Sequence, residues 1–235
     1  MPNFLPCQPA YCRPAAFEAF RQELPAIDTP EGLLRAATAI SLHAEPDGSV
    51  DEVVDVVQRL ARSVRQRLQS NSQRALLAHL HDVLFDVIGF RGVEFSTYYD
   101  AGNSYLPRVL NTRRGIPITL TLVYRSVASS LGLRVEGVNS PGHFLAAVTC
   151  HEPTGDALLY VDPFFGGALL TPTEALQRVE AVTGVADPTE ELLVVATPHA
   201  WLSRMLLNLQ AVFARQQQER DLLAMQELSS LLNMP

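Results

Sequence analysis

The stretch from Asn103 to Leu170 constrains the fold more than any other part of the chain. It contains a mostly apolar segment, residues 117–131, which begins with proline and ends just before Gly132. Proline suits the first turn of a helix, where its missing N–H costs nothing, and glycine commonly ends a helix. The apolar residues follow a helical period and extend beyond one face, which predicts a helix buried on most sides.

Two apolar runs rich in β-forming residues follow, at 143–150 and 157–162, with a turn cluster between them. Folding the chain at that turn brings His143 opposite the region from Asp162 to Phe164, where directly opposed residues have Cβ atoms about 5 Å apart. The exact register depends on the turn. A carboxylate at that place orients an imidazole and stabilises its charged form. The pattern predicts His143 and Asp162 as catalytic residues within hydrogen-bonding reach of each other.

Several motifs of this stretch resemble the SirB-type branch of the transglutaminase-like superfamily. They are GIPITL, PGHFLAAV and VDPFFGG, with NSYLPRVL upstream, and the resemblance covers roughly residues 33–179. It implies a papain-like core whose triad is a Cys at the start of a buried helix, a His at the start of a strand and an Asp on the next strand. The His maps onto His143 and the Asp onto Asp162. The implied fold class is α+β, helix-rich, with a small antiparallel sheet.

The Cys of that triad has no counterpart in this sequence. The resemblance puts it at about Pro117 or Ile118, and neither residue can be a nucleophile. The nearest hydroxyl, on Thr119, is weak without a strong adjacent base, and it lies about 100° further round the helix. Members of the SirB-type branch commonly lack this Cys, as the resemblance implies. We therefore expect no thiol-dependent transamidation or proteolysis.

The other cysteines do not replace it. Cys150 is seven residues after His143, and an odd offset places it on the opposite face of a strand, as a small buried hydrophobe. Cys7 and Cys12 form a C-x4-C pair with no further ligand nearby, which makes a poor zinc site. We expect no disulfide between Cys150 and either of them.

Composition excludes several classes of function. The net charge is −7, and all basic side chains are arginine, so nucleic acid and anionic membranes are poor partners. No run approaches the roughly 18 apolar residues of a membrane span, and the first residues do not form a signal peptide. An odd number of cysteines fits the reducing cytoplasm. His79 and His81 are two apart and do not share a helical face, so we expect neither a metal site nor a cofactor.

The chain divides into four predicted segments. They are a proline-rich leader at 1–28 with a short helix at 15–23, a helical region at 29–112, a transglutaminase-like core at 113–196, and a helical hairpin at 197–235. Within the helical region we expect a helix over residues 72–88. The last segment weakly resembles one tetratricopeptide unit, and we expect two antiparallel helices that meet the core or another subunit.

A loop at 90–102 is rich in aromatic residues, which either line a groove beside His143 or only pack the loop down. Arg114 could hold an acidic group of a ligand or pair with Glu94 or Asp100. The candidate groove residues are Tyr98, Tyr99, Asn103, Ser104, Arg114 and Phe164.

Two functional hypotheses follow. The missing Cys favours a non-catalytic binding or regulatory protein that takes a peptide, protein or small ligand in the old active-site groove. The alternative is a hydrolase or acyl transferase that uses His143 and Asp162 with Thr119 or an activated water. We expect a protein or peptide partner, no nucleic acid and no membrane.

Overall fold

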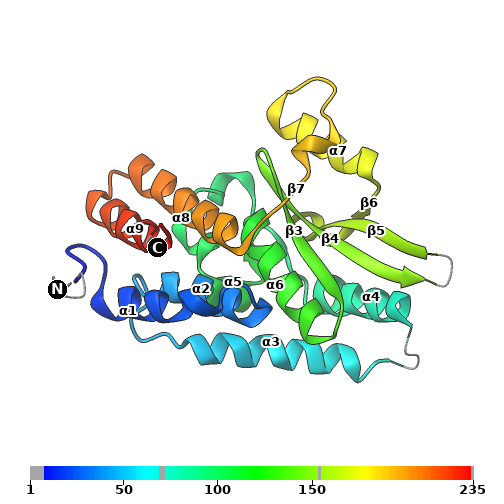
Figure 1. The fold of residues 1–235 in the computed structure, drawn as a ribbon, viewed down its shortest axis with the longest axis horizontal. Helices are drawn as coiled ribbons and strands as arrows, with labels where there is room; N and C mark the ends of the chain where they lie inside the picture. Colours follow the sequence, from blue (N-terminus) through cyan, green and yellow to red (C-terminus); the bar gives the residue numbers. More distant parts are fainter. Residues whose placement is uncertain (1–7, 69–71, 153–154, 234–235) are drawn as a thin grey trace, which may run out of the picture.

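The computed structural model describes residues 8–68, 72–152 and 155–233, and every element below lies within these ranges (Figure 1). The helices are α1 Pro14–Glu23, α2 Pro30–Ser41, α3 Val50–Arg65, α4 Gln73–His81, α5 Leu106–Thr112, α6 Pro117–Ser130, α7 Pro172–Thr183, α8 Pro198–Arg215 and α9 Glu219–Leu232. The strands are β1 Arg91–Gly92, β2 Arg114–Gly115, β3 Arg134–Ser140, β4 His143–Glu152, β5 Gly155–Asp162, β6 Ala168–Leu170 and β7 Val194–Val195.

The main sheet is antiparallel, with the strand order β6-β5-β4-β3-β7. The predicted hairpin is its centre, and β4 pairs with β5 in the register Ala146↔Val161. Strand β3, which precedes the hairpin, was not predicted and pairs with the other edge of β4. The helix-rich α+β fold with a small antiparallel sheet is therefore confirmed.

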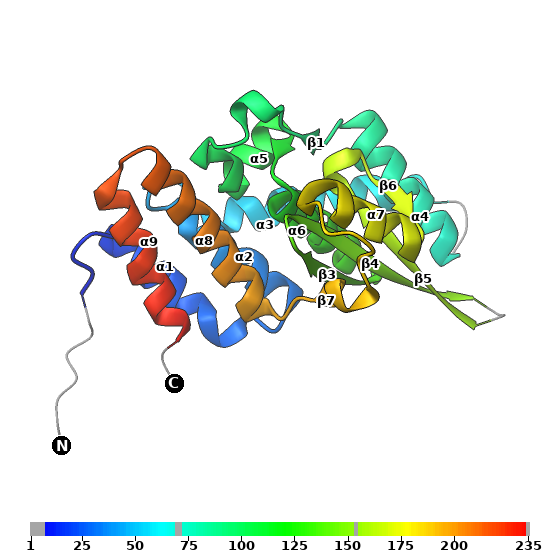
Figure 2. The ribbon, with the colours of Figure 1, turned by 90° about the horizontal axis from the view of Figure 1, so that it is seen from above.

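The two faces of the sheet pack against different helices. Phe144, Ala146 and Val148 on one face belong to the main core, together with residues of α6. Leu145 on the other face belongs to a smaller cluster with Val179 of α7. Figures 1 and 2 show α7 on its own side of the sheet, away from α2 and α3. Helix α6 is buried from Pro117 to Ala128, as its apolar pattern predicts.

The predicted leader contains part of the folded body. Helix α1 packs against α2, and its Phe17 and Phe20 lie in the main core. Ahead of it, the carboxylate of Glu227 accepts hydrogen bonds from the backbone N–H groups of residues 10–12. The short helix predicted at 15–23 is present as α1, whereas proline content does not reveal a docking partner 215 residues away. The division into four segments stays a prediction.

The predicted helix over 72–88 changes its type partway. After α4, residues 82–87 form a π-helix, and the N–H of Ile88 donates to the carbonyl of Val83 at 3.0 Å. Apolar periodicity does not distinguish this wider winding from an α-helix. No helix of the described ranges is long and apolar enough to cross a membrane.

The predicted C-terminal helical hairpin is confirmed as α8 and α9, which pack on each other and on the main core. Trp201 of α8 is 1% exposed, and its ring centroid lies 4.6 Å from that of Phe144. A Cβ at Gly137 would lie 2.1 Å from Trp201, so glycine leaves the space that the indole fills. The C-terminal hairpin therefore packs closely against β3, the strand that leads to His143.

Replacing Trp201 with alanine should lower the free energy of unfolding by about 3–5 kcal/mol, because it leaves a large cavity in a packed core. Urea denaturation measures the loss. Leu207→Ala on the same helix, where the side chain is 59% exposed, is the matched control and should change stability by less than about 0.5 kcal/mol. Equal effects of the two variants would show that α8 is only loosely attached.

His81 has a structural role and a pH-dependent effect. Its Nε2 lies 2.9 Å from the hydroxyl oxygen of Tyr124, and burial lowers the pKa of His81 from 6.5 to about 4. Between these values the unfolded chain binds a proton that the folded chain does not, so acidification favours unfolding. The wild type should lose up to about 3 kcal/mol more than His81→Gln between pH 7 and pH 4. His199→Gln, at an exposed site, is the control, and identical pH dependence in wild type and His81→Gln would contradict the expectation.

Candidate functional site

A tight turn places His143 at the start of β4. Ser140 pairs with His143 across Pro141 and Gly142, and Gly142 has φ +68°. Proline followed by a residue with positive φ is the pattern of a type II turn, which favours glycine at that place. A Cβ on Gly142 would also approach a methyl carbon of Val182 to 2.5 Å. The position of the imidazole therefore depends on the Pro-Gly sequence before it.

His143 and Asp162 lie within hydrogen-bonding distance, as the hairpin predicts. Nε2 of His143 is 2.9 Å from Oδ2 of Asp162, and both side chains are buried. The other carboxylate oxygen, Oδ1, accepts from the backbone N–H groups of Phe164 and Phe165 at 3.1 and 3.3 Å. Nε of Arg178 lies 3.7 Å from Oδ2. Asp162 thus orients the imidazole and also fixes the loop that follows β5.

A cavity of about 560 Å³ lies beside this pair. Apart from His143, its lining is predominantly apolar and aromatic: Val93, Phe95, Tyr98, Tyr99, Pro117, Gly142, Phe164, Phe165 and Val182. Asp162 occupies Nε2, so Nδ1 is the imidazole nitrogen that a ligand in the cavity would meet. Burial raises the pKa of the Tyr98 hydroxyl, which keeps it a neutral hydrogen-bonding group at neutral pH.

The position expected for a nucleophile is occupied by proline. Pro117 is the first residue of the buried helix α6 and lines the cavity together with His143. The next residue, Ile118, is 2% exposed and belongs to the main core. A helix N-terminus beside an imidazole is the environment that lowers a cysteine pKa, but this helix begins with a side chain that cannot titrate.

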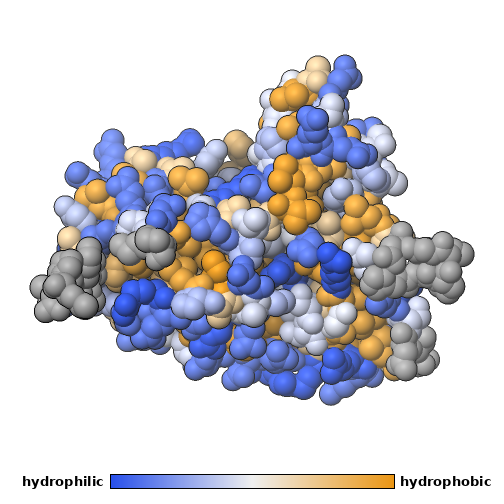
Figure 3. All heavy atoms as spheres, viewed as in Figure 1, coloured by the Kyte–Doolittle hydropathy of each residue, from blue (hydrophilic) through white to orange (hydrophobic). Residues whose placement is uncertain are grey.

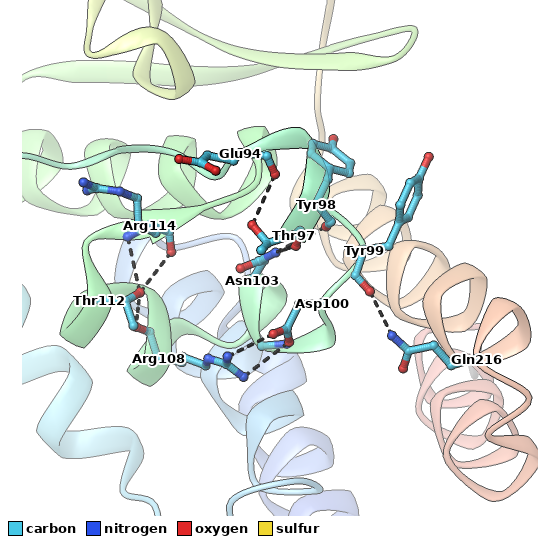
Figure 4. A network of polar contacts seen from close by, with 11 residues as sticks. Glu94, Thr97, Tyr98, Tyr99, Asp100, Asn103, Arg108, Thr112, Arg114 and Gln216 are labelled. Atoms are coloured by element: carbon cyan, nitrogen blue, oxygen red, sulfur yellow. Dashed lines mark hydrogen bonds and ion pairs between the residues drawn. The ribbon is translucent and has the colours of Figure 1, made fainter.

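Three of the six predicted groove residues line the cavity: Tyr98, Tyr99 and Phe164. The other three do not. Asn103 supports the aromatic loop, since its Nδ2 donates to the carbonyl oxygens of Thr97 and Tyr98, and Figure 4 shows the two tyrosine rings extending away from it.

Arg114 and Ser104 lie outside the cavity lining. Arg114 donates to the carbonyl oxygen of Gly89 at 2.9 Å and pairs with neither Glu94 nor Asp100 among the described contacts. Asp100 instead forms an ion pair with Arg108 at 3.0 Å. Ser104 is buried.

Thr119 is also absent from the cavity lining. Its side chain is fully buried, and its hydroxyl donates to the carbonyl oxygens of Asn103 at 2.9 Å and Ile116 at 3.0 Å. The hydroxyl therefore closes the first turn of α6 and connects it to Asn103, just after the aromatic loop. The structure therefore does not bring Thr119 to His143.

Sequence reasoning did not assign Phe165, Val182 or Arg178 to the site, and it considered Phe95 only as part of the aromatic loop at 90–102. Phe165 follows Phe164 in the VDPFFGG motif, so the motif contained a signal for it. Val182 and Arg178 are on α7, and nothing in their local sequence shows that this helix returns to the cavity. Their placement depends on the packing of α7 on the sheet.

Cys150 lies where strand parity predicts. Cys150 is buried in the main core, on the face of β4 opposite to His143, and no disulfide joins it to Cys12 within the described residues. Burial raises the pKa of the Cys12 thiol to about 12, so it is not a thiolate at neutral pH. Cys7 lies outside the described residues. The described ranges contain no cluster of three or more metal-ligating side chains.

The geometry is that of a base and its orienting carboxylate beside the first turn of a buried helix, in an aromatic cavity. The family model described as "Transglutaminase-like superfamily" matches residues 51–207. The chain therefore belongs to the transglutaminase-like superfamily.

Curated relatives of this chain occur in bacteria and in mammals. A UPF0162 protein of Xylella fastidiosa (strain 9a5c) is 34% identical over 187 residues, which cover 77% of this chain and 65% of the relative. F-box only protein 21 of Homo sapiens is 29% identical over 217 residues, which cover 80% of this chain and 33% of the relative. The chain thus spans about two thirds of the bacterial relative and a third of the human one. No solved structure matches the chain significantly.

The environment of Pro117 generates a direct test. Pro117→Cys should create a thiol with a lowered pKa, because the helix N-terminus and the imidazole of His143 both stabilise a thiolate. Iodoacetamide at pH 6.5 should alkylate this thiol at least about tenfold faster than it alkylates the wild-type cysteines. In the double variant Pro117→Cys with His143→Ala, the rate should be lower than in Pro117→Cys alone. A Val185→Cys variant, at an exposed position outside the cavity lining, supplies the unactivated reference rate. Equal rates at the two introduced thiols would refute the proposed activation.

Proposed function

We propose that this chain is a non-catalytic member of the transglutaminase-like superfamily, which binds a peptide or protein segment in the cavity beside His143. The observation that carries the proposal is the lining of that cavity. A proline stands where the resemblance places the nucleophile, and aromatic side chains surround the one accessible imidazole nitrogen. Concave, mostly apolar sites with a few convergent polar groups are typical of ligand binding.

The chemistry of the remaining groups supports binding over covalent catalysis. An acyl enzyme needs a nucleophile within reach of the base. The hydroxyl of Thr119 is engaged in two backbone contacts, and Cys150 lies on the far face of β4. A His–Asp pair alone can still hold a ligand through a hydrogen bond from or to Nδ1.

A hydrolase that uses His143, oriented by Asp162, as a base toward water is the second candidate. The pairing of the imidazole favours it, since Asp162 engages Nε2 and the described contacts give Nδ1 no protein partner. Such general-base assistance contributes about 10²–10⁴-fold to a rate. The superfamily context alone does not distinguish the two candidates.

Finer assignments belong to the same proposal. We place the chain in the SirB-type branch, interpret α8 and α9 as a tetratricopeptide-like hairpin, and take the cytoplasm as its location.

A peptide library displayed on phage should yield binders on the wild type that are lost on Val182→Trp, because an indole at this position would fill the cavity. Val182 is 53% exposed and lines the cavity. Val185→Trp, three residues further at a 46% exposed site outside the lining, is the matched control and should retain the binders. Peptides that survive Val182→Trp would bind elsewhere and contradict the proposal.

Turnover provides the complementary measurement. A panel of ester, amide and amine-acceptor substrates should give no turnover with the wild type, His143→Ala or a cysteine-free variant. Turnover lost in the cysteine-free variant would overturn the non-catalytic proposal in favour of a thiol enzyme. Turnover lost only in His143→Ala would favour the water mechanism instead.

A further inference from the structure

Four aromatic rings form a row along the cavity, which we call the aromatic row: Tyr99, Tyr98, Phe164 and Phe165. Neighbouring ring centroids are 5.4, 6.3 and 5.2 Å apart in that order, and each pair is T-shaped. The imidazole of His143 lies 6.1 Å from both phenylalanine rings. The imidazole therefore lies beside the phenylalanine end of the aromatic row.

A guanidinium group covers each end of the aromatic row. The Cζ of Arg215 lies 4.3 Å from the ring centroid of Tyr99, and the Cζ of Arg178 lies 4.2 Å from that of Phe165. A guanidinium stacked on a ring keeps N–H donors on its edge for a carboxylate. The two arginines come from different helices, α8 and α7, on either side of the cavity.

Protein carboxylates satisfy these two cations only weakly. Among the described residues, Arg215 forms no ion pair, and the ion pair of Arg178 with Asp162 is long at 3.7 Å. Glu174, one turn before Arg178, accepts from the N–H and hydroxyl of Thr171 at 2.7 and 2.8 Å. These hydrogen bonds are the main cause that lowers the pKa of Glu174, and the charge of Arg178 is the smallest one. Figure 4 shows the carboxylate of Glu94 directed away from the tyrosine rings. In a chain of net charge −7, the ends of the aromatic row thus present local positive charge.

We propose that the cavity selects an extended peptide in which apolar or aromatic residues are flanked by acidic residues, which Arg178 and Arg215 bind. The inference rests on the proposed function and adds the chemistry of the ligand. Extended chain advances about 3.3 Å per residue, so ring spacings of this size suit alternate side chains of one strand. The apolar residues contact the aromatic row, and the flanking carboxylates reach the arginine edges.

Single-stranded nucleic acid is the competing occupant, since aromatic and arginine side chains also stack on bases. The observations favour the peptide. T-shaped neighbours leave few open ring faces, and the arginines cover a face of Tyr99 and of Phe165. The net charge also opposes a polyanion.

The test is fluorescence anisotropy with labelled peptides of about nine residues that share an apolar, aromatic centre. Three versions carry glutamate, glutamine or lysine at both ends. The wild type should bind the glutamate version most tightly, and this preference should weaken as salt is added. Arg178→Gln and Arg215→Gln should each weaken binding of the glutamate peptide about threefold to fivefold and leave the glutamine peptide unchanged.

The glutamine peptide serves as an internal control for damage to the cavity, because Arg178 also contacts Asp162. Arg59→Gln, at an exposed site on α3, is the matched surface variant and should change nothing. Equal wild-type affinity for the glutamate and glutamine peptides would overturn the inference. So would binding of none of the peptides, or a thymidine oligonucleotide that displaces the glutamate peptide. If library binders are still lost in Val182→Trp, the proposed function survives that failure.

Discussion

The carboxylate of Asp162 is the interaction on which the site depends. One oxygen holds Nε2 of His143, and the other accepts from the N–H groups of Phe164 and Phe165. A buried carboxylate is costly unless its oxygens are paired, and here both have partners. The same group therefore sets the direction of the imidazole and the position of two cavity rings. Any change at Asp162 would alter the base and the binding wall together.

Contacts far along the chain hold the cavity walls. Arg204 of α8 donates to the carbonyl oxygen of Ser140 at 2.8 Å and to the side chain of Asn139, at the end of β3 before the turn. At the C-terminal end of α8, Nε2 of Gln216 donates to the carbonyl oxygen of Tyr99 at 3.0 Å. One wall is thus attached to α8 and the other to the connection after it. These two contacts attach the C-terminal hairpin to both walls of the cavity, although they join residues 64 and 117 positions apart in the sequence. The surface around β7 is apolar and open to solvent. Figure 3 shows apolar side chains there, and Val194 and Val195 are half exposed.

Sequence patterns predicted what depends on local periodicity. The period of two in the hairpin brought His143 to Asp162 and put Cys150 on the other face. Helix α6 followed from its proline start, apolar length and terminal glycine. Sequence patterns did not predict the positions of side chains that depend on tertiary packing. Thr119 was a candidate because its hydroxyl is near the expected nucleophile, but backbone carbonyls capture that hydroxyl. Arg178 and Val182 lie at the site only because α7 covers the sheet, and the docking of residues 10–12 on Glu227 of α9 has no local sequence signal.

Under the proposed function, the proline at the start of α6 explains how the framework keeps its shape without a nucleophile. A proline in the first turn loses no hydrogen bond and fixes the backbone in a helical conformation, so the helix begins as well as it would with cysteine. Its ring adds apolar surface to a cavity already lined by aromatic residues. In the proposed function, the imidazole, its carboxylate and the start of α6 form a fixed polar point in an apolar site. Such preorganised groups cost little to order when a ligand arrives, which favours specific binding.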